Sequence, residues 1–150
     1  MKLAEALNTR ADLQKRIQQL RTRLINNSKV QEGEKPAEDP NALINELDSC
    51  CDELKELITR INLTNAATVH GGRSITDLIA QRDTLATKLG IYRDLLNSAS
   101  AVVNRMVHTE IKVLPSVDVG SLQKKIDELS KFYRILDSRI QELNWTTELM

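Results

Sequence analysis

The amino-acid sequence predicts an all-α protein of four long antiparallel helices, arranged as a bundle or as coiled-coil hairpins. Apolar residues recur every three or four positions through four long segments, which is the spacing of one helix face. The segment 74–107 is the clearest, because its stripe runs from Ile75 to Met106 and only Arg82 interrupts it. At about 1.5 Å per residue this stripe spans roughly 48 Å, so other helices must lie along it. Aromatic residues form only 3% of the chain, and aliphatic stripes suit helix-on-helix packing.

The first helix is predicted at about 2–27, and residues 29–39 form a polar, acidic segment that we expect to be a mobile loop. The second helix is predicted at 40–66, with Asp39 as its N-cap and Pro40 in its first turn. It carries two apolar lines, which predict either a central place in the bundle or an oligomer interface. The main line is Leu43, Leu47, Cys50, Leu54, Leu57 and Ile61, and the second line is Ile44, Cys51, Ile58 and Asn65.

Two local signals mark the start of the third helix, which we expect at 74–107. Gly71 and Gly72 predict a tight turn, and Ser74 with Asp77 forms a capping-box pattern. Residues 110–117 are richer in β-branched side chains and predict a short extended arm. The fourth helix is expected at 119–143, and the whole chain 1–150 is interpreted as a single helical domain.

Composition and charge exclude several classes of function. The chain has 21 basic and 21 acidic residues, so it lacks the positive charge of a general nucleic-acid binder and any reason to bind an anionic membrane. No apolar run is long enough to span a bilayer, and no export signal is found, so we expect a cytoplasmic protein. Cys50 and Cys51 are neighbours in a helical pattern, cannot form an ordinary disulfide, and are expected to be reduced.

No pattern in the sequence points to a catalytic site, a metal or a cofactor. A phosphate loop, a nucleophile elbow and a metal-binding helix motif are all missing. His108 and Glu110 alternate in the extended arm, but two ligands do not make a metal site, so surface roles are the better interpretation for both and for His70.

The polar residues that interrupt the apolar stripes are the best candidates for a site. In an up-down-up-down bundle they gather at one end of the molecule. Arg10 and Arg82 need acceptors there, because an unpaired buried charge is costly. One interpretation is a polar plug that fixes helix register and subunit pairing, and another is a site for a small anion or metabolite. The candidate ligand-binding residues are Arg10, Asp12, Asn62, Asn65, Arg82, Asp83, Asn144 and Trp145, and Glu148 is a further candidate partner for the arginines.

Several blocks of the sequence resemble the septicolysin-like family of small bacterial helical proteins. They are Met1–Leu7, Arg10–Gln14, Asn26–Glu34, Arg60–Thr68 and Asn144–Leu149. The resemblance covers nearly the whole chain and implies a helical bacterial protein without an established activity, so it assigns no catalytic residue.

The function that the sequence favours is a self-assembling structural or protein-interaction module whose partner is a second copy of the chain. The alternative is a bundle that binds a small anion or metabolite, or acts as an enzyme, through the residues around Arg10 and Arg82. A membrane-lytic toxin, which the family name suggests, is the least favoured reading.

Overall fold

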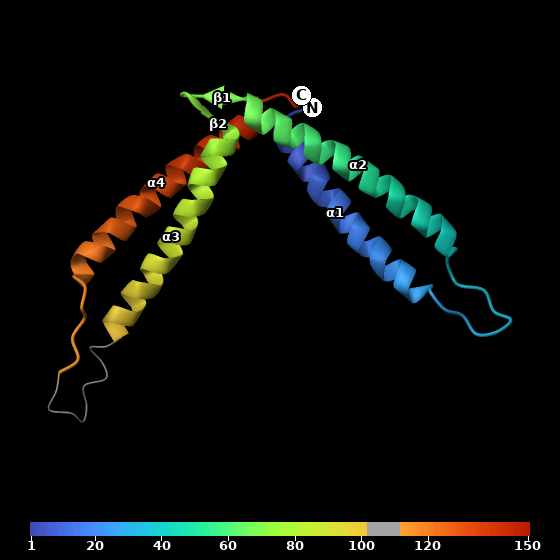
Figure 1. Cartoon of the computed structure of the whole chain (residues 1–150), viewed down its shortest axis with the longest axis horizontal. Helices are drawn as coiled ribbons and strands as arrows, with labels where there is room; N and C mark the ends of the chain where they lie inside the picture. The colour runs from blue at the N-terminus through green and yellow to red at the C-terminus, as the bar shows by residue number, and fades with distance from the viewer. Residues whose placement is uncertain (102–111) are drawn as a thin grey trace. The chain divides into compact units, whose positions relative to one another are not determined.

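The computed structural model describes residues 1–101 and 112–150, and its helices confirm the all-α fold class. In chain order the elements are α1 (Leu3–Asn26), α2 (Pro40–Ala67), β1 (Val69–His70), β2 (Arg73–Ser74), α3 (Ile75–Ala101) and α4 (Val119–Thr146) (Figure 1). They divide into two compact units. The first comprises residues 1–70 and 143–150, and the second comprises residues 71–142.

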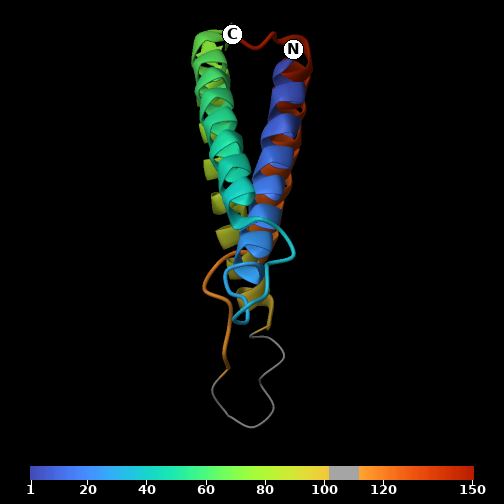
Figure 2. The ribbon, with the colours of Figure 1, turned by 90° about the vertical axis from the view of Figure 1, so that its right-hand side faces the viewer.

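In the first unit, α1 and α2 form an antiparallel hairpin and lie side by side (Figures 1 and 2). Its core includes the buried residues Leu20, Leu43 and Cys50, and the last two belong to the main apolar line predicted for the second helix. On one side of this core, Arg16 of α1 pairs with Glu46 of α2 at 2.7 Å. The hairpin therefore buries one apolar stripe from each helix, and the ion pair beside the core links α1 to α2.

The two ends of the chain meet in the first unit. Leu3 N donates a hydrogen bond to Thr147 O at 2.9 Å, and Leu149 N donates one to Met1 O at 2.9 Å. The side chain of Glu148 pairs with Lys2 Nζ at 2.6 Å and with the terminal amine of Met1 at 3.2 Å. The hydrogen bond from Leu3 N gives the first backbone N–H of α1 a partner that the helix itself cannot provide.

A buried threonine of α2 also holds the C-terminal residues. Thr64 is fully buried, donates through Oγ1 to Arg60 O at 2.8 Å, and accepts from Met150 N at 3.0 Å. Arg60 Nε donates to Met150 O at 2.7 Å. Since the Thr64 hydroxyl both donates and accepts, its burial leaves no unpaired polar group.

The connection between α1 and α2 is the non-helical segment that we predicted at 29–39. Its two ends are fastened by side chains: Glu38 accepts from Arg23 at 2.5 Å, and Glu38 N donates to the side chain of Asn27 at 3.0 Å. The predicted cap is confirmed, because the Asp39 side chain accepts from Asn41 N at 3.0 Å and Pro40 begins α2.

The turn before α3 also follows the prediction. Gly71 and Gly72 have φ values of 59° and 79°, a region that favours glycine, and they join β1 to β2 in a two-stranded ladder that we did not foresee. The capping box is confirmed: Ser74 N donates to the Asp77 carboxylate at 3.2 Å, and Asp77 N donates to Ser74 Oγ at 3.1 Å.

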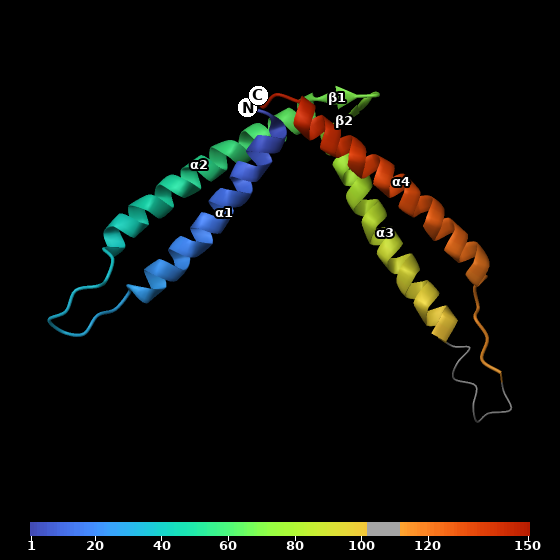
Figure 3. The same ribbon diagram turned by 180° about the vertical axis from the view of Figure 1, so that it is seen from behind.

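In the second unit, α3 and α4 form the other antiparallel pair (Figure 3). Leu85, Leu89 and Ile126 form its core cluster, with Tyr92 and Tyr133 packed against it. The start of α4 at Val119 agrees with the prediction, and its cap is Asp118, whose side chain accepts from Ser121 N at 3.0 Å. That backbone hydrogen bond lowers the pKa of Asp118 below its ordinary value.

The sequence predicted that the fourth helix ends at 143 and the third at 107. The fourth helix ends at Thr146 and not at 143, because the apolar stripe ends there but the backbone pattern continues through Asn144 and Trp145. Residues 102–111 lie outside the described part of the chain. They include the end of the predicted third helix, the start of the predicted arm, and His108 and Glu110. Residues 112–118 form neither helix nor strand. No described helix combines the length and apolar character needed to cross a membrane.

The closure of the chain ends predicts a pH dependence. Hydrogen bonds from Lys2 and the terminal amine lower the pKa of Glu148 below its ordinary value of 4.5. A carboxylate with a lowered folded-state pKa stabilises the protein above its unfolded pKa, and that stabilisation is lost as the pH falls through the folded value. Glu148→Gln should therefore lower the melting temperature at neutral pH, and the gap from wild type should shrink below about pH 4. Glu32→Gln, in the connecting loop, is the control; a gap that persists in acid would contradict the prediction.

The adjacent cysteines should differ in their effect on stability. Cys50 is 5% exposed and packs in the first core cluster, whereas Cys51 is exposed. Cys50→Ala should lower the free energy of unfolding by about 1 kcal/mol, because it leaves a small cavity. Cys51→Ala should have a smaller effect. Chemical denaturation of the two variants tests this, and equal losses would contradict it.

Candidate functional site

The polar residues predicted to form a site are divided between the two units. The first unit holds Arg10, Asp12, Asn62, Asn65, Asn144 and Trp145, and the second holds Arg82 and Asp83. Glu148, a candidate partner for the arginines, pairs instead with Lys2 and the terminal amine. The ion pair that the structure forms within the predicted set is that of Arg82 with Asp83.

Arg82 lies at the centre of a carboxylate cluster in the second unit. Its side chain is 22% exposed; Nε donates to Asp83 at 3.0 Å, and Nη1 donates to Asp137 of α4 at 3.1 Å. Partial burial acts to lower the pKa of this guanidinium, but the hydrogen bonds to the two carboxylates outweigh it and raise the pKa. The arginine that interrupts the α3 stripe thus ties α3 to α4 and has its charge balanced. Sequence reasoning missed Asp137, which follows the buried residue Leu136.

The predicted residues of the first unit differ widely in exposure. Asn144 is buried, Arg10 and Asn65 are half-buried, and Asp12 and Asn62 are exposed. The Oδ1 atom of Asn65 is buried and accepts no hydrogen bond from the described residues. Trp145, expected as a wall of the site, is 59% exposed.

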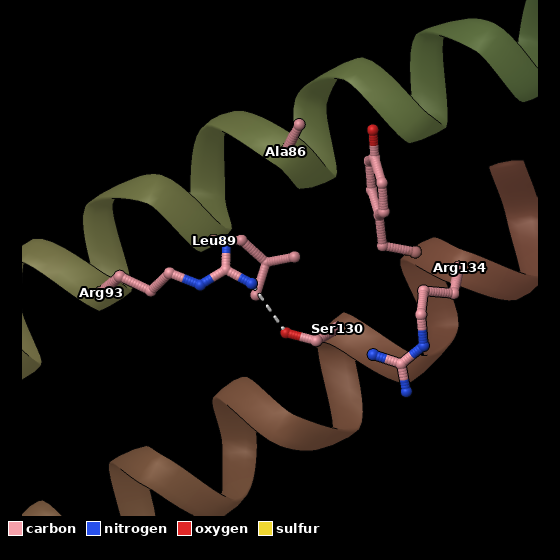
Figure 4. Close-up of a pocket in the computed structure, with 6 residues that line it drawn as sticks. Ala86, Leu89, Arg93, Ser130 and Arg134 are labelled. Atoms are coloured by element: carbon pink, nitrogen blue, oxygen red, sulfur yellow. Dashed lines mark hydrogen bonds between the residues drawn. The ribbon is translucent and has the colours of Figure 1, made fainter.

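A hollow of about 270 Å³ lies between α3 and α4 in the second unit. Its lining residues are Ala86, Leu89, Arg93, Ser130, Tyr133 and Arg134. Arg93 reaches from α3 to α4 and donates to Ser130 Oγ at 3.0 Å, whereas the Arg134 guanidinium lies apart from this hydrogen bond, beyond Ser130 (Figure 4). The two cations therefore do not converge on one point, and the lining contains no carboxylate or histidine to act with them. Within the described residues, no group of three or more histidine, cysteine or acidic side chains is arranged to hold a metal ion.

The second apolar line of α2 forms an exposed surface on the first unit. Leu43, Cys50 and Leu57 are buried in the unit, and the residue after each of them belongs to the second line. In that line Ile44 is 44% exposed, Cys51 is exposed and Ile58 is half-buried. The pairing of α1 with α2 thus covers the first line of α2 and leaves much of the second uncovered.

The described residues thus form a helical-hairpin protein whose candidate functional features are an exposed apolar line on α2 and a hollow between α3 and α4. The chain belongs to the family of unknown function DUF6847, whose family model matches residues 10–149. It is also similar to the crystal structure of a functionally unknown conserved protein from Corynebacterium diphtheriae. That similarity has a TM-score of 0.92 and 39% sequence identity, and it covers 100% of this chain and 99% of the other. No curated protein matches the chain, and neither match names the septicolysin-like family.

The Arg82 cluster gives a prediction that separates a structural role from anion binding. Arg82→Met should lower the free energy of unfolding by about 1 kcal/mol, because it removes two ion pairs, and the one with Asp137 joins α3 to α4. Lys131→Met, an exposed change of the same charge on α4, is the control. Sulfate should raise the melting temperatures of wild type and Arg82→Met equally, since the carboxylates already balance the arginine. A sulfate response that the variant loses would assign an anion site instead.

Proposed function

We propose that this protein is a self-associating helical module that acts through assembly and protein interaction. The observation that supports this proposal best is the apolar part of the second line of α2, in which Ile44 and Cys51 are exposed and Ile58 is half-buried. Single exposed apolar residues are ordinary on protein surfaces. A line that repeats along one helix, beside a stripe that is already buried, is the pattern of a helix with a second packing partner.

The energetic argument favours association with a second copy. Burying an aliphatic side chain such as Ile44 contributes about 1.5–3 kcal/mol relative to leaving it fully exposed. In a two-fold assembly each surface is used twice, so a modest line on one helix contributes from both subunits. Exposed apolar side chains of the second unit, including Ile91 at 62% and Ile135 at 59%, are additional surface for association.

The rival functions have less support from the contacts described above. Binding of a small anion by Arg10 and Arg82 would compete with the two carboxylates that Arg82 already holds.

A location in the bacterial cytoplasm is also part of our proposal, and the two free thiols of Cys50 and Cys51 support it. The relation to septicolysin-like proteins also stays a hypothesis, and leakage of dye-loaded vesicles on addition of the pure protein would revive a lytic role.

Light scattering of the full chain tests the proposed function. We expect the mass of a homo-oligomer at micromolar concentration. Ile44→Asp should shift the population toward monomer, because it places a charge in the line that association would bury. Val30→Asp introduces the same charge at another exposed position, in the connecting loop, and should leave the mass unchanged. A wild-type protein that remains monomeric throughout the micromolar range would overturn the proposal.

A further inference from the structure

The second apolar line of α2 has a symmetry that bears on how it would be covered. Ile44 lies seven positions before Cys51, and Ile58 lies seven positions after it. A seven-residue repeat keeps side chains on nearly the same face of a helix. The apolar part of the line, before Asn65, is therefore a row of three side chains with a small one at its centre and a β-branched one at each end.

A row of this kind is complementary to itself when a second copy runs in the opposite direction. A two-fold axis through Cys51 places Ile44 of one copy opposite Ile58 of the other, and the second such pair follows by symmetry. The small side chain on the axis lets the two helices approach closely at their crossing point. A parallel arrangement also matches like with like along the row, so the apolar residues alone do not choose between the two directions.

The charges beside the row do choose a direction. Asp48 and Lys55 are exposed on α2, three positions before and four positions after Cys51. Their spacing puts both on the flank of the row farther from the buried Leu43 and Leu57 stripe. An antiparallel pair brings Asp48 of each copy beside Lys55 of the other, so two opposite-charge contacts form. In a parallel two-fold pair the same flank of the two copies lies on opposite sides of the contact, so Asp48 and Lys55 do not meet and this attraction is absent.

We propose that the partner of this surface is a second copy of the chain, docked through an antiparallel contact of α2 with α2 centred on Cys51. This inference rests on the proposed function, because it names the partner and the geometry of the same surface. It adds that Ile44 packs on Ile58 across the contact, and that Asp48 and Lys55 set the direction.

A charge-swap series in the full chain tests the direction of the contact. Asp48→Lys and Lys55→Asp should each raise the dimer dissociation constant about tenfold, because each turns two attractive contacts into repulsive ones. The double variant that carries both changes should return to within about threefold of wild type, since it exchanges the charges and keeps the pairing. Asp94→Lys, an exposed change of the same kind on α3, controls for net charge. Single variants with wild-type affinity, or a double variant no better than the singles, would overturn the proposed contact.

Cross-linking through Cys51 tests the position of the axis independently. With a short bismaleimide, a reagent that joins two thiols, the Cys50→Ala variant should form a covalent dimer through Cys51. The Cys51→Ser variant should not, because Cys50 is buried. If light scattering shows an oligomer but Cys51 does not cross-link, the antiparallel α2 contact is wrong and self-association stands. If light scattering shows a monomer, both the proposed function and this contact fail.

Discussion

The main constraint on each unit is that a two-helix hairpin gives each helix a single neighbour along its length within that unit. A helix in that position buries one stripe, and its other faces must be polar or find another partner. In the first unit the buried stripe includes Leu20 and Leu43, and in the second it includes Leu89 and Ile126. Both cores are narrow, so contacts at the ends and flanks of the hairpins matter more than they would in a thicker bundle.

The first unit depends on such end contacts because its helices are joined by a connecting loop at one end only. At the other end the chain termini provide the closure, through the backbone pairing of Leu3 with Thr147 and the ion pairs of Glu148. Thr64 contributes a hydroxyl whose donor and acceptor are both used. At the loop end, Glu38 joins the connecting segment to Arg23 and Asn27, so polar contacts fasten both ends of the hairpin.

The same constraint explains why the candidate functional features are surfaces. A pair of helices encloses no deep cavity, and the hollow beside Arg93 and Ser130 is shallow and has no converging charged groups. Arg82 is half-buried, and the carboxylates of Asp83 and Asp137 balance its charge. Its contact with Asp137 links the two helices of the unit. What a narrow hairpin does offer is an uncovered helix face, and on α2 that face carries Ile44 and Cys51.

The sequence by itself determined the features that depend on neighbouring residues. The helix periods, the Asp39 cap, the Ser74–Asp77 capping box and the turn at Gly71 and Gly72 act within a few positions, so local patterns identify them. It also marked Arg82 as a polar exception in the apolar stripe and included Asp83 among the residues expected near it. Only the tertiary structure decided the contact of Arg82 with Asp137, 55 positions away, and that of Met1 with Glu148, 147 positions away. Such contacts depend on how helices align and where the chain ends meet, which periodicity does not specify. For the same reason, periodicity gave α2 two apolar lines, and packing against α1 decided which one is buried.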